Sequence, residues 1–220
     1  MRTGHPLREP KAPSLPKTLT PATFADANVE HDGKYLSVAY GPVTLTGTAE
    51  DPEFERCRFD QTRFSGVTLH RPGFADVEFT GADLANARLF NSRMFAATVA
   101  SCRMTGLHLP ESGLRDVLFD ACRADMANFR FAHLREVVFR DCNLSEADFQ
   151  NAELANVRFE RCKLVVAQFS NATMNAVRFS GCDLNGVRGV TSFDGAIVTP
   201  ADAMGLLDAL TSALGITIED

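Results

Sequence analysis

The feature that most constrains this chain is a five-residue repeat that runs without interruption from Phe54 to Leu184. Every fifth position in this range is apolar, most often Phe, Leu or Met. Two residues before each of them lies a second series, made mainly of Ala, Val and Cys. The other positions of each five are mostly polar or charged, so we expect them to face water. Helices repeat every 3.6 residues and strands every two, so neither element explains a period of five.

A backbone that turns a corner every five residues accounts for this period. Four such sides close a square coil, in which residue i lies directly under residue i+20. Three residue types recur at this spacing: Cys102, Cys122, Cys142, Cys162 and Cys182; Val117, Val137, Val157 and Val177; Phe119, Phe139, Phe159 and Phe179. An amphipathic helical array is the alternative, but a strict five drifts off any helical face within a few turns. Seven or so coils at strand spacing would form a rod roughly 34 Å long.

Several of these fives have a recognisable composition. A-D-F-Q-N at 147–151, A-E-L-A-N at 152–156 and G-A-D-L-A at 81–85 resemble the A-(D/N)-L-x-x units of pentapeptide repeat proteins. That family folds as a right-handed quadrilateral β-helix, so the resemblance implies an all-β solenoid. The match covers roughly 52–188 and contains no insertion. It is specific for the fold and unspecific for function.

The N-terminal quarter of the chain departs from the regular count. Residues 1–21 hold five prolines among charged residues, and we expect a flexible Pro-rich tail. The repeat β-helix is predicted over 22–198, with irregular first coils at 22–50. In these coils Tyr35, Tyr40 and Leu45 stand one position out of phase, until Gly47 to Asp51 restores it. A hairpin at the Gly41-Pro42 pair is the alternative.

The C-terminal residues 199–220 are predicted to form a capping and dimerisation helix with a short tail. Gly189 breaks the series, and Phe193 and Val198 continue it in a shifted phase. Thr199 then serves as N-cap, Pro200 begins the helix and Gly215 ends it. The apolar residues of this helix exceed what a plug for the rod needs. It is either only a plug, or its surplus surface joins two rods end to end.

The C-terminal pattern also resembles one branch of the family. A final coil, a Leu/Ala-rich helix and a G-I-T-I-type terminus are similar to the topoisomerase-protecting Qnr, MfpA and AlbG type, and the uninterrupted count resembles the loopless MfpA pattern. The resemblance implies a homodimer that binds DNA gyrase or topoisomerase IV as a mimic of duplex DNA. It also implies resistance to a fluoroquinolone or natural-product poison. The dimer interface would then comprise Met204, Leu206, Leu207, Leu210 and Leu214.

The charges of the rod limit how far DNA mimicry can extend. Duplex DNA would carry on the order of twenty negative charges over 34 Å, whereas acidic and basic side chains nearly balance over 51–190. One candidate topoisomerase-facing acidic column projects from the wall centred on Phe119 and Phe139: Asp60, Asp120, Asp141 and Glu160. The same wall carries Arg58, Arg140, Arg158, Arg161 and Arg178, so a solvated mixed-charge surface is the alternative. Leu118 above Val138 is predicted to form a contact strip or to pack against the N-terminal tail.

Other chemistry finds little support in the sequence. A net charge of −6 and a pI near 5.4 argue against direct nucleic-acid binding. No stretch of eighteen apolar residues and no signal-like N-terminus is present, so we expect a cytoplasmic protein with no membrane contact. The cysteines share an inward position where thiolates would be desolvated. The histidines lack ligand spacing, and no catalytic motif is found.

We therefore expect no enzyme activity, no cofactor, and no catalytic or metal-binding residues. Binding of a topoisomerase is the leading interpretation. A structural scaffold or spacer with an unknown partner is the alternative. A third possibility, an accessory domain of an enzyme, lacks the second domain that it would serve.

Overall fold

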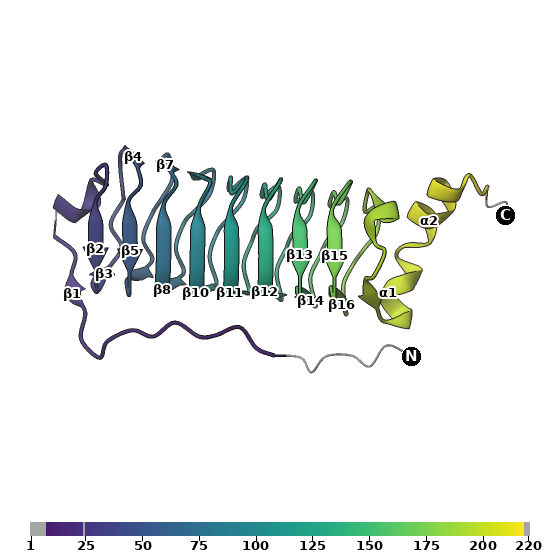
Figure 1. The fold of residues 1–220 in the computed structure, drawn as a ribbon, viewed down its shortest axis with the longest axis horizontal. Helices are drawn as coiled ribbons and strands as arrows, with labels where there is room; N and C mark the ends of the chain where they lie inside the picture. The colour runs from purple at the N-terminus through teal and green to yellow at the C-terminus, as the bar shows by residue number, and fades with distance from the viewer. Residues whose placement is uncertain (1–7, 24, 218–220) are drawn as a thin grey trace.

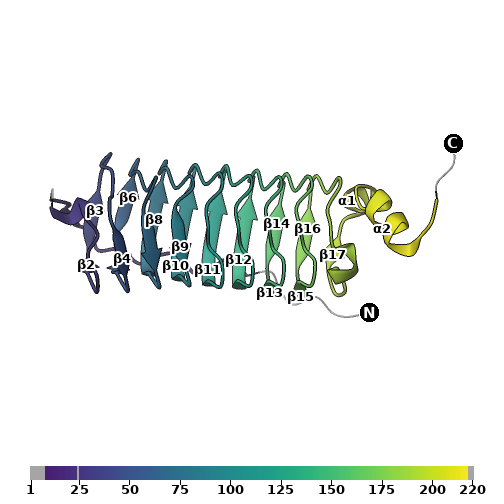
Figure 2. The same cartoon turned by 90° about the horizontal axis from the view of Figure 1, so that it is seen from above.

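The protein is a rod of stacked square coils, seen from two sides in Figures 1 and 2. The computed structural model describes residues 8–23 and 25–217. Every strand pairing in this part of the chain is parallel, and wherever both partners lie between residues 48 and 188 they are twenty positions apart. Met94, for example, pairs with Leu114, and Leu114 pairs with Leu134. The predicted right-handed quadrilateral β-helix is confirmed.

The four sides of the coil form four walls, named here in chain order. Wall A contains β2 (Lys34–Leu36), β5 (Glu53–Glu55), the first half of β8 (Gly73–Thr80), β10 (Arg93–Ala100), β11 (Gly113–Asp120) and β12 (His133–Arg140), then β13 (Glu153–Ala155) and β15 (Thr173–Asn175). Wall B contains β1 (Thr20–Pro21), β3 (Val38–Tyr40), β6 (Arg58–Asp60), the second halves of β8 to β12, β14 (Arg158–Glu160), β16 (Arg178–Ser180) and β17 (Ile197–Val198).

The other two walls are less regular. Wall C is a ladder of isolated bridges that runs from Thr44 to Asp183. Wall D contains β4 (Thr48–Glu50), β7 (Thr68–His70) and β9 (Arg88–Phe90), and isolated bridges continue it to Arg188. Because each coil bonds only to its neighbours, the rod has no lateral edge and only its two ends are open.

The core of the rod is a set of vertical side-chain stacks. Phe119, Phe139 and Phe159 lie one above the other with ring centroids 4.8 and 5.2 Å apart. Phe129, from the opposite wall, meets Phe139 edge-on at 5.8 Å. Stacked rings along one wall and edge-to-face contacts between walls are both favourable geometries, and together they fill the interior.

The cysteine column is the most direct test of the quarter-turn geometry. Cys142 and Cys162 are both buried, and their thiols donate to the carbonyl oxygens of Phe119 and Phe139 at 3.5 and 3.2 Å. Cys57 makes the same contact with the carbonyl of Tyr35 at 3.2 Å. Burial raises the pKa of Cys57 to about 11. These thiols are therefore protonated packing groups at neutral pH.

Each corner requires one residue in the left-handed region. Positions such as Asp116, Asn156 and Val166 have φ between 54° and 60°. Asn, Asp and Gly adopt this conformation with little strain, which explains their abundance at the corners. Val166 is the unfavourable case, because a β-branched side chain rarely has a positive φ. The repeat tolerates it because the hydrogen bonds above and below fix the backbone.

The first coils are shorter than the rest. Tyr35 pairs with Phe54 at a spacing of 19, and Thr20 pairs with Val38 at a spacing of 18. The 3-10 helix η1 (Ala25–Ala27) lies in the first coil. A hairpin at Gly41-Pro42 is excluded, because β3 pairs in parallel with both β1 and β6. Phe24, which belongs to the predicted repeat span 22–198, lies outside the described residues.

The segment before the first coil is not arranged as we expected. Residues 8–21 run along the outside of the rod toward its N-terminal end, where the segment finishes in β1 (Figure 1). We call this segment the strap. The sequence indicated a flexible tail because its prolines prevent regular pairing. The strap indeed makes no ladder beyond β1, but single side-chain contacts hold it in place instead.

The C-terminal end is closed by helices. After η2 (Val190–Ser192) and β17, α1 (Pro200–Met204) and α2 (Leu207–Leu214) replace the single helix that we predicted, with the break at Gly205. The Thr199 side chain caps α1 by accepting from the amide of Asp202 at 3.2 Å, and Gly215 ends α2 with a φ of 68°. Within the described residues no helix is long and apolar enough to cross a bilayer.

Asp202 joins this cap to the rod. Its buried carboxylate accepts hydrogen bonds from the amides of Gly181 and Cys182 at 3.0 and 2.9 Å. Asp202 lies twenty residues after Cys182, so its side chain takes the place that the next coil would occupy. The carboxylate therefore satisfies donors that the end of a solenoid would otherwise leave unpaired.

We predict that Asp202→Ala lowers the free energy of unfolding by about 1–3 kcal/mol, because two backbone donors lose their acceptor. Asp202→Asn keeps one acceptor oxygen, so its loss should be smaller. Asp208→Ala is the matched control, because Asp208 is an exposed acid of the next helix. Urea denaturation of the three variants measures the difference. Equal stability of Asp202→Ala and Asp208→Ala would contradict this role.

Candidate interaction surfaces

Wall B carries the acidic residues that the sequence placed on one column. Asp60, Asp120 and Glu160 lie in one vertical register, which passes through Thr80, Ala100 and Arg140 between them. Asp141 lies at the adjoining corner, where its φ is 51°. The structure therefore brings the four residues to one side of the rod, but it does not make them a continuous acidic stripe.

Two of these four acids are held in ion pairs. The carboxylate of Asp141 binds both Nε and an Nη of Arg161 at 2.7 Å, which lowers the pKa of Asp141. Glu160 binds Nε of Arg140 at 2.9 Å and contacts Nε of Arg158 at 3.2 Å. The mixed-charge alternative therefore describes the C-terminal half of wall B, whereas no ion pair involves Asp60 or Asp120 within the described residues.

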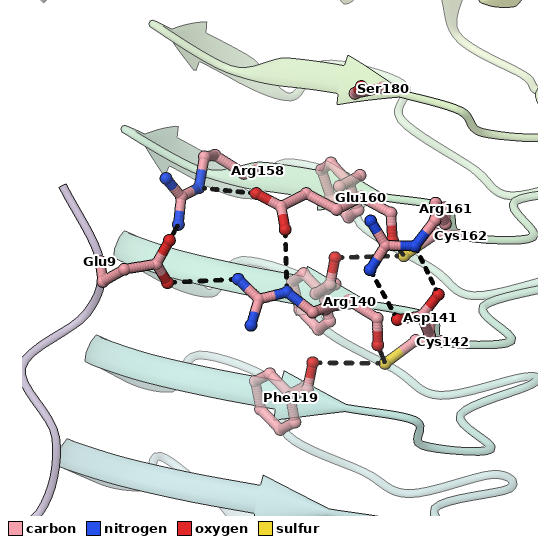
Figure 3. A network of polar contacts seen from close by, with 12 residues as sticks. Glu9, Phe119, Arg140, Asp141, Cys142, Arg158, Glu160, Arg161, Cys162 and Ser180 are labelled. Atoms are coloured by element: carbon pink, nitrogen blue, oxygen red, sulfur yellow. Dashed lines mark hydrogen bonds and ion pairs between the residues drawn. The ribbon is translucent and has the colours of Figure 1, made fainter. Parts of the chain in front are cut away.

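The strap adds a further acid to this network. Figure 3 shows Glu9 lying between Arg140 and Arg158, with its two oxygens 3.3 and 2.7 Å from their Nη atoms. The Arg158 side chain is almost fully buried, so Glu9 and Glu160 balance a charge that has little access to water. Burial alone would raise the pKa of Glu9, but the hydrogen bonds and positive charges of Arg158 and Arg140 outweigh it and leave this pKa lowered.

Further along the strap, backbone amides are the anchors. The amide of Lys11 donates to Oδ1 of Asp116 at 2.9 Å, and the amide of Ser14 donates to Oδ1 of Asp76 at 2.9 Å. Both acids stand at the corner between walls A and B. Asp116 is only 3% exposed. The carboxylates of Asp76 and Asp116 thus accept hydrogen bonds from backbone amides of the strap, which has no strand partner at these positions.

Val138 has the surroundings expected for packing against the N-terminal segment. It is only 1% exposed, although it is not part of the rod's core cluster. It pairs with Arg158, which holds Glu9 of the strap. Leu118, its neighbour on the preceding coil, is partly buried. Of the two predictions for this pair, the structure favours packing against the strap over an open contact strip.

We predict that Glu9→Gln loosens the strap while the rod stays folded. A partly exposed ion pair contributes about 0.2–1 kcal/mol, so the exchange rate of the Lys11 amide should rise roughly 1.5- to fivefold in hydrogen exchange. Because the folded pKa of Glu9 is lowered from 4.5, this contribution is present at neutral pH and is lost as the pH falls through the folded value. Glu146→Gln, an exposed acid elsewhere, should leave the rate unchanged.

The C-terminal helices carry the predicted dimer residues, and the structure divides them into two groups. Leu206 is 5% exposed and packs in the core, so it belongs to the plug and offers no surface. Met204, Leu207, Leu210 and Leu214 remain exposed, Leu214 at 72%. Ile216 joins this exposed group, although the sequence analysis did not single it out. A group of large exposed apolar side chains at one end of a rod is typical of an interface.

The described residues contain no group of three His, Cys, Asp or Glu side chains arranged to hold a metal ion. His133 pairs with Glu153 at 2.9 Å, and His70 stacks on Phe90 with centroids 5.2 Å apart. The polar side chains described on the four walls thus form ion pairs, contact the strap or are exposed to solvent.

These features define a class of protein: a parallel β-solenoid built from five-residue repeats, with apolar columns inside and polar columns outside. A family model described as "Pentapeptide repeat region" matches residues 74–149, 92–169 and 116–188. Together the matches span 74–188, more than half of the 220 residues. The chain therefore belongs to the pentapeptide repeat family. Comparison with curated proteins gives no match.

Several solved structures are similar to this rod. A trypsin-treated variant of QnrB1, a plasmid-mediated fluoroquinolone resistance protein, has a TM-score of 0.50 at 18% identity and covers 84% of this chain and 99% of its own. Full-length QnrB1 has a TM-score of 0.37 at 18% identity, covering 81% of this chain and 99% of its own.

A third similar structure is HetL, a pentapeptide repeat protein involved in heterocyst differentiation regulation from the cyanobacterium Nostoc sp. strain PCC 7120. It has a TM-score of 0.35 at 16% identity and covers 76% of this chain and 87% of its own. At a TM-score of 0.50 and 18% identity, the likeness to the trypsin-treated QnrB1 variant shows the fold alone.

Proposed function

We propose that this protein is a non-enzymatic, cytoplasmic binder of a type II topoisomerase, DNA gyrase or topoisomerase IV, and that it protects this enzyme from a poison such as a fluoroquinolone or a natural product. The observation that carries the proposal is the combination of an uninterrupted pentapeptide rod with an exposed apolar C-terminal helix. The fold similarity to QnrB1, a fluoroquinolone resistance protein, supports it.

Wall B is the surface that we assign to the topoisomerase, as a partial mimic of DNA. Asp60 and Asp120 supply acidic groups outside ion pairs, whereas Asp141 and Glu160 are largely neutralised by arginines. Mimicry then depends on a few acids and on the shape of a straight rod, with far less charge than a duplex of equal length carries.

The decisive experiment is a gyrase supercoiling assay in the presence of a poison, with and without the protein. Protection should appear as restored supercoiling at protein concentrations comparable to that of gyrase. Asp60→Lys with Asp120→Lys should weaken it, while Arg88→Glu on wall D should not. Absence of both protection and complex formation at every concentration would exclude a topoisomerase role.

We further propose that two rods join through Met204, Leu207, Leu210 and Leu214. Leu207→Glu or Leu210→Glu should give monomers in sedimentation, because a charge would be buried at the joint. Leu36→Glu is the matched control, since Leu36 is also an exposed leucine, at 57%, and lies at the other end of the rod. An unchanged mass of the helix variants would contradict this joint.

A scaffold role with another partner is the second candidate. It is favoured by the ion pairs of wall B, because Arg140, Arg158 and Arg161 neutralise the acids that a DNA mimic would present. A rod that fails the supercoiling assay yet dimerises as predicted would fit this role.

A further inference from the structure

Wall A contains a groove on a side of the rod that the proposed function leaves unused. The groove has a volume of about 570 Å³ and crosses the strands β5, β8, β10, β11 and β12. Gly73, Ala75 and Gly113 give it depth, because side chains are small or absent at outward positions of the wall. Gly113 lines the groove, and a Cβ atom added there would have no atom within 4 Å, so we call this open part of the groove the hollow at Gly113.

Basic side chains surround the hollow at Gly113. The parallel pairing places Arg93 one rung before Gly113 and His133 one rung after it. Arg115 follows on the same strand, and Arg135 lies in register with Arg115. At a strand spacing of about 4.8 Å, these groups lie within reach of one bound segment. The wall is therefore strongly basic over three consecutive strands.

The arginines of the groove are only weakly neutralised. Arg93 and Arg135 form no ion pair within the described residues, and both are exposed. Arg115 has a buried acid, Asp116, at 3.6 Å, and the carboxylate of Asp116 also accepts the Lys11 amide. His133 is paired with Glu153. Among the described residues, no carboxylate lies within ion-pair distance of these two guanidinium groups, so both can pair with an anionic partner.

The strap brings a further cation to the same place. The Lys11 Nζ atom lies 5.2 Å from the ring centroid of Phe95, and the guanidinium carbon of Arg115 lies 5.7 Å from that centroid. Phe95 stands in the groove directly below Arg115. The contact between the Lys11 amide and Asp116 fixes this position. The strap is thereby a part of the groove's basic rim as well as a cover for the corner.

We propose that this groove binds a short, extended acidic segment of a partner protein. Its carboxylates would pair with Arg93, Arg115, Arg135 and Lys11, and an apolar side chain would enter the hollow at Gly113 beside Phe95. The five strands cover about 19 Å, the length of roughly six extended residues. This inference stands independently of the topoisomerase proposal, because it concerns a different wall and the opposite charge.

The acidic residues at the two ends of the groove favour a short acidic peptide over a nucleic acid as its ligand. Glu53 and Glu55 close one end of the groove, and Glu153 lies just beyond the other end, next to His133. A duplex that carries a negative charge every 1.7 Å would be repelled at both ends. A short segment with its acids near the centre meets only the basic strands.

The test is fluorescence anisotropy of the labelled peptide Gly-Glu-Glu-Leu-Glu-Glu-Gly with the full-length protein. We expect saturable binding that weakens with salt. Arg115→Glu with Arg135→Glu should reduce affinity roughly tenfold or more, given the usual strength of exposed ion pairs. Gly113→Leu, which fills the hollow without altering charge, should reduce it by a similar factor. Lys11→Glu should weaken binding more than Lys17→Glu, which changes an exposed strap residue elsewhere.

Two controls make the result decisive. Arg88→Glu reverses an exposed arginine of wall D and should leave the affinity unchanged. A double-stranded oligonucleotide should compete poorly. No binding at millimolar protein, equal loss in Arg88→Glu, or full binding by Gly113→Leu would each overturn the proposal. So would competition by the oligonucleotide at equal concentration, or a change of sedimentation mass in Gly113→Leu, which would identify a second copy as the occupant.

Discussion

The structure depends on one constraint: each residue must fit directly above the residue twenty positions earlier. The ring of Phe139 packs between those of Phe119 and Phe159, so a substitution at Phe139 would alter the packing of both neighbouring coils. The same stacking aligns the backbone donors and acceptors of adjacent coils. The stability of the rod is then a sum of contacts between neighbouring coils, and the two terminal coils lack one set of these contacts. The helical cap at one end and the short first coils at the other are consequences of this arrangement.

Because the interior is occupied by packing, chemistry in this molecule is confined to outward columns. Wall B combines acids with arginines and holds Glu9 of the strap, whereas wall A combines arginines with a hollow floor. The two walls meet at the corner of Asp76 and Asp116, and the strap lies along this corner. One short segment thus links a mixed-charge surface and a basic surface, and the outward side chains of each can be changed without altering the core.

The sequence predicted the fold well, because the period of five is an internal property of the repeats. The phase shift at Tyr35 and the helix caps at Thr199 and Gly215 were predictable for the same reason, since each is a local signal. The course of the strap was not. Lys11 and Asp116 are 105 positions apart, and an amide that donates to a carboxylate leaves no pattern in either segment. The surface role of Leu206 was also misjudged, because one apolar helix face does not reveal which leucine turns inward at Gly205.

The carboxylate of Asp202 has a consequence for the behaviour of the molecule in a crowded solution. A parallel solenoid that ended on bare strand edges would offer a template on which other chains could add indefinitely, as in a fibril. Asp202 and the first turn of α1 occupy that edge with a charged group and a helix, neither of which can be extended by a strand. The repeat therefore makes a particle of finite length, and association is left to side chains rather than to the backbone.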